Sequence, residues 1–277
     1  MHAPSLPIEL DLDRPHVARV NNYLAGGCTN FSADRSLADA ALAVHPRLWT
    51  AARDAALFTR RAVGHLARAG VRQFVDLAQG VPLEDRAVHD VAHAVDATCR
   101  VIYVEDDPVV HALQSALSST DTGLVACVRA SPLLPEGIWG HGRVCGMFDL
   151  TEPVAVVVGA LLQHLPYRYG PRGVLHCLTA GLPTGSHVVM THLSGDTGLH
   201  SRTAAVARVY RIHGIPLRPR TRHEILALVP GTPIAPGLVP AARWHADPRS
   251  PAAEEAVACY AAVSELDAST PARRIGT

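Results

Sequence analysis

Residues 71–82 read Val-Arg-Gln-Phe-Val-Asp-Leu-Ala-Gln-Gly-Val-Pro, and this stretch decides the fold. Its apolar run is typical of a buried strand that stops at Asp76 and breaks into a turn at Gly80. A helical pattern follows, and a second apolar run at 101–104 ends in three carboxylates, Glu105, Asp106 and Asp107. Strand, glycine turn, helix, strand and acid, in this order, are typical of a nucleoside-binding α/β half-sheet.

The turn after the first strand restricts which nucleoside the chain can bind. Dinucleotides and P-loop nucleotides need glycine-rich turns whose N–H groups hold phosphate. Here only Gly80 matches such a pattern, and Pro82 lacks an N–H donor. S-adenosylmethionine has no phosphate, so it needs one close backbone approach for its amino-acid end and an acid for its ribose. The turn therefore favours S-adenosylmethionine over a nicotinamide cofactor and excludes a P-loop nucleotide.

The composition narrows the class of protein. The chain has 277 residues, of which 48% are hydrophobic, enough for one large α/β domain with appendages or two small domains. Its 25 basic and 25 acidic residues balance, so we expect a small-molecule substrate and neither a nucleic-acid nor a membrane partner; a homodimer is left open. The six cysteines lack zinc spacing, and no signal peptide or membrane-length apolar run is seen, which predicts a cytoplasmic protein.

Hydrophobic periodicity divides the chain into three parts. Residues 1–70 are predicted to form an N-terminal helical lid, with helices at 16–24, 32–43 and 48–69. Residues 71–245 are predicted to form an α/β domain of alternating strands and helices, with a Gly/Pro-rich loop at 131–146. Residues 246–277 are predicted to form a C-terminal helix and tail, with a terminal hairpin as the alternative.

Several separated motifs resemble one family. The segments that carry the resemblance are 18–27 (Ala-Arg-Val-Asn-Asn-Tyr-Leu-Ala-Gly-Gly), Asn30-Phe31, Asp34-Arg35, 72–77, 88–92, 101–110 and 236–240. Their order is similar to that of an actinobacterial family of S-adenosylmethionine-dependent methyltransferases, formerly known only as a domain of unknown function. The resemblance implies a class I methyltransferase fold, which is a Rossmann-like, mostly parallel sheet of seven strands, here with an N-terminal helical lid.

The cofactor loop departs from the family pattern. Where the family reads Asp-x-Gly-Thr-Gly-x-Pro, this chain has Ala78 and Gln79 in place of the first glycine and the hydroxyl residue. Ala78 puts a methyl group against the path of the cofactor. After the third strand the family commonly has an Asp suited to the adenine amino group, and Val128 stands near this position. All three changes weaken the match to an S-adenosylmethionine site.

The strand ends and the resemblance together define a candidate cofactor site. Glu105 is placed to accept hydrogen bonds from the ribose hydroxyls, whereas Asp107, which precedes a proline, is equally well placed as a helix N-cap. Asp76 either contacts the cofactor or holds the turn together, and residues 26–31 either face the cofactor or simply end a helix. The cofactor-binding candidates are Gly26, Gly27, Asn30, Phe31, Asp76, Ala78, Gly80, Pro82, His89, Glu105, Asp106 and Asp107.

Two histidines follow strands at the edge where chemistry occurs in this architecture. His164 and His192 are candidate general bases toward a substrate hydroxyl or amine, with a structural role as the alternative for each. His89 and His93 have the helical spacing of zinc ligands, but the sequence places no third ligand, so no metal site is predicted. Aromatic candidates for a substrate pocket are Tyr167, Tyr169 and Tyr210.

Methyl transfer asks little of a protein beyond alignment of the nucleophile and exclusion of water, because the sulfonium supplies the leaving group. The sequence therefore predicts an S-adenosylmethionine-dependent methyltransferase that acts on a small-molecule acceptor. Two alternatives remain. One is a family member whose cofactor site has decayed, leaving a binding or regulatory protein. The other is a pocket reused for a different reaction such as a cyclisation, and Ala78, Gln79 and Val128 are the residues that favour these alternatives.

Overall fold

A central sheet organises the computed structural model, which describes residues 11–77, 87–117, 122–165, 168–196, 200–246 and 258–267. Its strands are β1 (Gln73–Leu77), β2 (Arg100–Glu105), β3 (Val125–Arg129), β4 (Val154–Gly159), β5 (His187–Leu193), β6 (Thr232–Pro233), β7 (Val239–Pro240) and β8 (Cys259–Glu265). The strand order is β3-β2-β1-β4-β5-β8-β6, and β7 pairs with β8. The described residues thus form eight strands rather than the predicted seven. Two of the eight, β6 and β7, are separate strands of only two residues each.

The strands β1 to β5 are parallel, which confirms the predicted α/β class. From β1 the chain moves outward through β2 to β3 and then returns to β4 on the other side of β1. Asp76 therefore lies opposite Tyr103 on one side and Val157 on the other. This reversal is a topological switch point, and open α/β sheets bind ligands at the carboxyl ends of the strands beside it.

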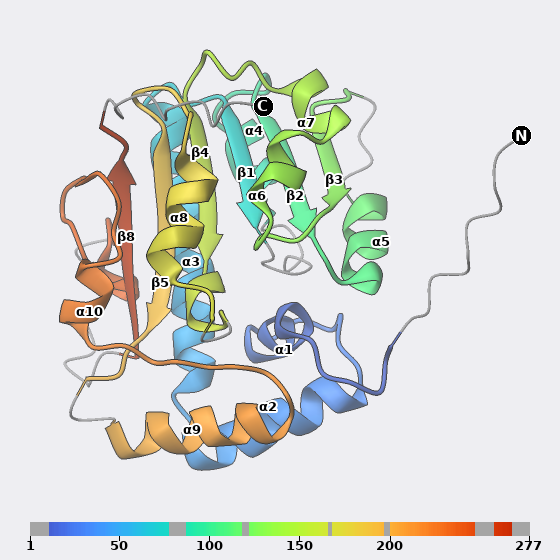
Figure 1. The fold of residues 1–277 in the computed structure, drawn as a ribbon, viewed down its shortest axis with the longest axis vertical. Helices are drawn as coiled ribbons and strands as arrows, with labels where there is room; N and C mark the ends of the chain where they lie inside the picture. The colour runs from blue at the N-terminus through green and yellow to red at the C-terminus, as the bar shows by residue number, and fades with distance from the viewer. Residues whose placement is uncertain are drawn as a thin grey trace, which may run out of the picture.

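Helices cover both faces of the sheet (Figure 1). None of them within the described ranges is both long and apolar enough to cross a membrane. The α-helices are α1 (Val17–Leu24), α2 (Ser32–Val44), α3 (Leu48–Arg68), α4 (Val88–His93), α5 (Pro108–Leu117), α6 (Pro135–Trp139), α7 (Gly142–Met147), α8 (Pro171–Thr179), α9 (His200–Ile212) and α10 (Arg222–Leu226), and the 3-10 helices are η1 (Leu161–Gln163) and η3 (Ala241–Arg243).

The segment predicted as one N-terminal lid divides into two parts in the structure. The helix α3 packs on the sheet, where Phe58, Ala62 and Leu66 are buried in the core together with residues of β4, β5 and β8. In contrast, α1 and α2 lie beyond the carboxyl ends of the parallel strands, with α9 beside α2 (Figure 1). We call α1, α2 and α9 the cap. The cap therefore combines N-terminal helices with a helix that comes after β5, while α3 belongs to the layers of the sheet.

The described part of the C-terminal segment is a strand, so the prediction of a helix is wrong for residues 258–267; residues 247–257 and 268–277 lie outside the described ranges. Alanines at this segment favour a helix locally. The strand forms because β8 pairs antiparallel with the whole of β5, from His187 opposite Glu265 to Leu193 opposite Cys259. Alternate residues of β8 enter the two core layers on opposite faces of the sheet, which a helix would not allow.

The predicted loop at 131–146 contains two short helices, α6 and α7, and this prediction is also wrong. Pro135 occupies the first turn of α6, where its missing N–H group costs nothing. Ile138 of α6 and Val144 of α7 are buried in the core on the face covered by α8 and α10. Helices of five and six residues are too short to show a hydrophobic period among glycines and prolines.

Candidate cofactor and substrate site

Asp76 stands near the end of β1 and is buried, with 5% of its surface exposed. Its Oδ1 atom has no hydrogen-bond partner among the residues that the structure describes. Burial raises the pKa of Asp76 to about 8. A buried carboxyl group without partners is unfavourable, especially when ionised. The end of β1 therefore suits a ligand that brings a cation or a hydrogen-bond donor.

Glu105 and His89 lie close to Asp76 on the same face of the sheet. Side chains alternate along strands, so Asp76, its neighbour Tyr103 and Glu105 point to one side. The Tyr103 hydroxyl accepts a hydrogen bond from the backbone N–H of His89 at 3.1 Å and lies 2.8 Å from His89 Nδ1. Glu105 is 1% exposed, and burial lowers the pKa of His89. The fold thus brings together Asp76, Glu105 and His89, three of the residues predicted to bind the cofactor.

Asp106 joins the end of β2 to the cap. Its Oδ1 lies 3.4 Å from Nε2 of His16. Because His16 Nδ1 accepts the N–H of Ala18 at 3.3 Å, Nε2 carries the ring proton toward the carboxylate. Burial by itself would raise the pKa of Asp106, but the hydrogen bond from His16, with those from backbone N–H groups, brings this pKa below its ordinary value. His16 is a residue that the sequence argument did not single out.

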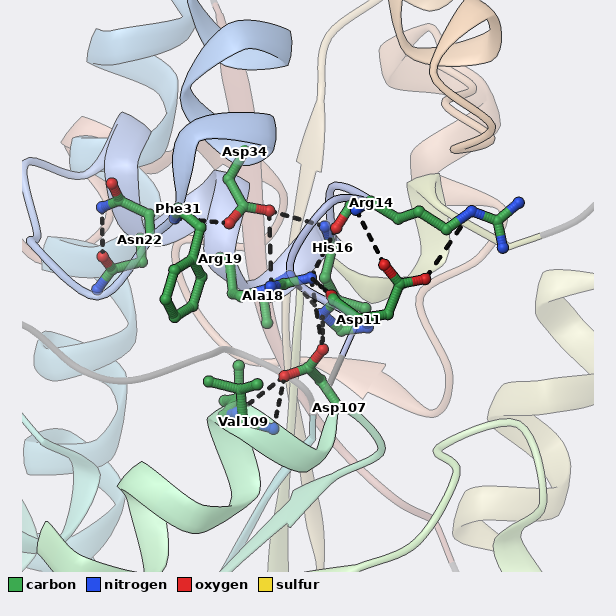
Figure 2. A network of polar contacts seen from close by, with 12 residues as sticks. Asp11, Arg14, His16, Ala18, Arg19, Asn22, Phe31, Asp34, Asp107 and Val109 are labelled. Carbon is green, nitrogen blue, oxygen red and sulfur yellow. Dashed lines mark hydrogen bonds and ion pairs between the residues drawn. The ribbon is translucent and has the colours of Figure 1, made fainter. Parts of the chain in front are cut away.

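Asp107 caps α5 and also belongs to a buried network that Figure 2 shows. Its Oδ1 accepts hydrogen bonds from the N–H groups of Val109 and Val110 at 3.0 and 2.8 Å, as expected of a helix N-cap. Its Oδ2 lies 3.7 Å from Nη2 of Arg19, whose Nε lies 3.6 Å from Oδ1 of Asp34. Arg19 and Asp34 are 2% and 0% exposed. One buried cation therefore links α1 and α2 of the cap to the end of β2.

Residues 26–31, which connect α1 to α2, bind mainly to one another. The Asn22 carboxamide accepts hydrogen bonds from the N–H of Thr29 at 2.8 Å and from Nδ2 of Asn30 at 3.1 Å. A Cβ atom at Gly27 would collide with the Asn22 carboxamide and displace it from its bonds to Thr29 and Asn30. The Phe31 ring lies beneath the Arg19 guanidinium. These contacts explain the turn, while a cofactor contact of Gly26, Gly27, Asn30 or Phe31 stays a prediction.

Several predicted positions lie outside the described residues, namely Ala78, Gln79, Gly80, Pro82 and Tyr167. Val128, in contrast, is well defined. It is 1% exposed, lies opposite Val104 in the sheet and belongs to the apolar core. Its side chain therefore offers no acceptor to an adenine amino group.

A cavity of about 230 Å³ lies between the cap and the carboxyl ends of β4 and β5. Its wall includes α1, the first half of α3, the segments after β3 and β4, and residues of β5, α9 and β8. Asp106 lies on this wall, so the cavity continues to the end of β2. Most lining residues are apolar. The polar and thiol side chains on the wall belong to His16, Asn21, Asp106, Gln163, His164, Thr191, Tyr210 and Cys259.

His164, predicted as a general base, lines the cavity, but its surroundings keep it neutral. Its Nδ1 lies 3.0 Å from the Pro216 carbonyl, which can only accept, so Nδ1 carries the proton. Gln163 Oε1 accepts the Leu193 N–H at 2.6 Å, which directs Gln163 Nε2 to donate to His164 Nε2 at 3.3 Å. Burial lowers the pKa of His164 to about 4. His164 is therefore a weak base with an engaged lone pair.

His192 does not line the cavity, and its predicted role as a general base is wrong. Along β5, Thr191 and Leu193 face the cavity and His192 points to the other face. Arg220 Nη1 donates to His192 Nε2 at 2.7 Å, and His192 Nδ1 lies 2.9 Å from the Leu193 carbonyl. Burial lowers the pKa of His192 to about 3. Both ring nitrogens are engaged in the protein interior, so neither can take a substrate proton.

Tyr210 lines the cavity as predicted, and Thr191 is a lining residue that the sequence argument missed. The Tyr210 ring stacks on His164 with centroids 5.7 Å apart, and burial raises the pKa of Tyr210 well above its ordinary value. Tyr169 lies elsewhere, with the Arg168 guanidinium 5.0 Å from its ring centroid. Threonine is a common strand residue, so nothing in the sequence distinguished Thr191 from its neighbours.

The fold and the site define a class I methyltransferase architecture, a Rossmann-like sheet whose first two strands end in buried acids beneath a helical cap. The sequence model of a family described as S-adenosyl methyltransferase matches residues 4–267. The chain belongs to this family, which confirms the resemblance seen in its motifs.

Two solved structures support this assignment. A DUF574 family protein from Streptomyces avermitilis is 32% identical with a TM-score of 0.87, and the match covers 94% of this chain and 100% of that one. A Thermobifida fusca protein, described as a candidate methyltransferase, is also 32% identical with a TM-score of 0.85, and the match covers 96% and 100% of the two chains. No curated protein matches the chain.

Proposed function

We propose that this protein binds S-adenosylmethionine at the carboxyl ends of β1 and β2 and transfers the cofactor's methyl group to a small molecule held in the cavity. The observation that carries the proposal is the buried Asp76 carboxyl at the switch point, whose Oδ1 has no partner among the described residues. The ammonium group of the cofactor's amino-acid end would satisfy this carboxylate by a charge-assisted hydrogen bond. Membership of the S-adenosyl methyltransferase family supports the same cofactor.

The residues at the ends of β1 and β2 offer partners to the amino-acid end and the ribose of the cofactor. Asp76 would hold the amino group, and the buried Glu105 would accept hydrogen bonds from the ribose hydroxyls. Val128, inside the core, would leave the adenine amino group to other partners. The bound cofactor supplies an electrophilic methyl group on a sulfonium. The protein then has to orient the acceptor and exclude water, and the cap, fixed over the strand ends through Arg19, suits the second task.

The volume of the cavity, about 230 Å³, and its mostly apolar lining support a small molecule as the acceptor. Its continuity with Asp106 would place an acceptor beside the cofactor edge. We also propose a cytoplasmic location, which the six unpaired cysteine thiols support.

Calorimetric titration with S-adenosylmethionine and S-adenosylhomocysteine tests the proposal. We expect micromolar binding to the native protein, which corresponds to about −8 kcal/mol. The variant Ala78→Gly restores the family's glycine and is the informative comparison. Binding to Ala78→Gly alone would instead support a decayed or reused site. The absence of heat and of a thermal shift at millimolar ligand in both proteins would contradict the proposal.

A further inference from the structure

Two residues on the cavity wall carry hydroxyl groups, and one of these groups is buried without a partner among the described residues. Thr191 extends from β5 and is 1% exposed, and its Oγ1 makes no hydrogen bond with any residue in the described ranges. Tyr210 reaches the cavity from α9, is 3% exposed and stacks its ring on His164. Native proteins leave few buried polar groups unsatisfied. The Thr191 hydroxyl, with the Tyr210 side chain on the same wall, therefore indicates that a ligand brings the missing polar group.

The wall around these hydroxyls favours an uncharged ligand. No arginine side chain is among the described residues that line the cavity, and the carboxylate of Asp106 is engaged with His16. His164, stacked on the Tyr210 ring, is neutral because burial lowers its pKa. The Cys259 thiol is neutral as well, since burial raises its pKa to about 12. An anionic ligand would lose its hydration here without gaining a counter-charge, and a cationic ligand would find only the Asp106 carboxylate, which already contacts His16.

The size and shape of the cavity suit a flat, two-ring molecule. An apolar cavity of about 150 Å³ accommodates benzene. The volume here is about 230 Å³, which leaves room for a second ring. One side of the cavity is formed by four small side chains of α3, whose methyl groups give a smooth surface for the face of a ring: Ala51, Ala52, Ala55 and Ala56.

We infer that the cavity binds a neutral, mainly apolar molecule of bicyclic size, with one hydroxyl or carbonyl group that hydrogen-bonds to Thr191 and Tyr210. The inference rests on the proposed function, in which this molecule is the methyl acceptor. It narrows the acceptor to uncharged ring compounds such as phenols and disfavours amino acids, nucleotides and other metabolites that carry an anionic group. Thr191 and Tyr210 are binding residues for this molecule.

Calorimetric titration of the full chain with 2-naphthol, which is bicyclic, neutral at pH 7 and carries one hydroxyl, tests the inference. We expect saturable binding that weakens about fivefold in Thr191→Val and in Tyr210→Phe, as for loss of one neutral hydrogen bond. Thr191→Ser keeps the hydroxyl and retains binding. Ser264→Ala is the matched control, because Ser264 Oγ is also buried without a partner among the described residues but lies outside the cavity. Melting curves establish that each variant is folded.

Three results would overturn the inference. They are the absence of saturable heat with 2-naphthol, equal affinity for the anion 2-naphthoate, and unchanged affinity in both hydroxyl variants. Titration with S-adenosylhomocysteine separates this inference from the proposed function. Binding of 2-naphthol as expected, with no binding of S-adenosylhomocysteine, would contradict the methyltransferase proposal and leave the cavity as a binding site. The reverse result would overturn the cavity inference alone.

Discussion

The network around Arg19 and the ends of the central strands are both buried and polar, but they differ in what balances them. In the network, the Arg19 guanidinium lies 3.6 Å from Asp34 and 3.7 Å from Asp107, so the charges are compensated within the chain, although Nε and Nη1 make no hydrogen bond with the described residues. Asp34 also accepts the N–H groups of His16 and Phe31 at 2.9 and 2.8 Å. This region holds the cap in place without help from a ligand (Figure 2).

At the strand ends, Asp76 Oδ1 and Thr191 Oγ1 lack partners within the described ranges. The free-energy cost of burying these two atoms would be smaller if a ligand formed hydrogen bonds with them. The comparison teaches that burial of polar groups does not by itself mark a binding site. Unused hydrogen-bonding capacity on a group that no ion pair compensates, placed at the carboxyl ends of parallel strands, is the more specific sign.

Arg19→Met breaks the compensated region and has the largest expected effect. It leaves Asp34 and Asp107 buried without their cation, so we expect the free energy of unfolding to fall by about 3–5 kcal/mol. Urea denaturation measures this loss. Arg14→Met is the matched control, because Arg14 pairs at 4.0 Å with Asp11 on the surface and should contribute little. Equal losses in the two variants would show that the network does not stabilise the fold.

In contrast to Arg19→Met, the substitution Asp76→Asn should increase the free energy of unfolding at neutral pH. The folded protein retains the Asp76 proton up to a pKa of about 8, whereas the unfolded chain releases it near pH 4. Stability from this group is therefore present at low pH and is lost as the pH rises toward 8. We expect the variant to be more stable than the native protein by on the order of 3 kcal/mol at pH 7 and no more stable at pH 3. Destabilisation at pH 7 would contradict an unpaired carboxyl.

His164→Leu tests the neutral histidine on the cavity wall. Burial lowers the folded pKa of His164 to about 4, whereas the unfolded value is near 6.5, so stability from this group is present above pH 6.5 and is lost as the pH falls through 4. Between pH 7 and pH 5 the native protein should lose about 2 kcal/mol more than the variant. Denaturation at both pH values measures the difference. Parallel losses would mean that His164 titrates normally in the folded state.

Thr191→Val has the smallest expected effect on stability. It removes a buried hydroxyl without a described partner at nearly constant volume, so we expect a gain of about 1 kcal/mol in the absence of ligand. Gln163→Leu, on the same wall, removes a carboxamide that is bonded at both ends and should destabilise the protein. Thermal denaturation compares the two. Losses of stability of similar size in both variants would show that hydrogen-bonded and unbonded polar groups on this wall contribute equally to stability.

The sequence predicted those features that depend on neighbours along the chain. The strand ends close to Asp76 and at Glu105, the long amphipathic α3 and the N-cap at Asp107 all follow from local pattern. The sequence did not predict features that depend on pairing between residues far apart in the chain. The strand β8 forms through β5, and the direction in which His192 points depends on the register of that strand.

The sequence also could not predict which polar residues around the site contact one another. Arg19 and Asp34 are fifteen positions apart on different helices. Gln163, which follows β4, accepts a hydrogen bond from Leu193 at the end of the neighbouring strand β5. The sequence showed these residues, and Arg19 and Asp34 even lie in the motifs that carry the family resemblance. Their pairing depends on how the cap meets the sheet, which no local pattern encodes.

Proton release on binding of S-adenosylhomocysteine tests the central claim most directly, because that claim is that Asp76 receives the cofactor's ammonium group. Calorimetry at pH 7 in two buffers of different ionisation enthalpy measures the number of protons released. With a pKa of about 8, Asp76 is largely protonated before binding and must ionise to form the ion pair. The account predicts release of close to one proton by the native protein and none by Asp76→Asn. Binding without proton release by the native protein would contradict it.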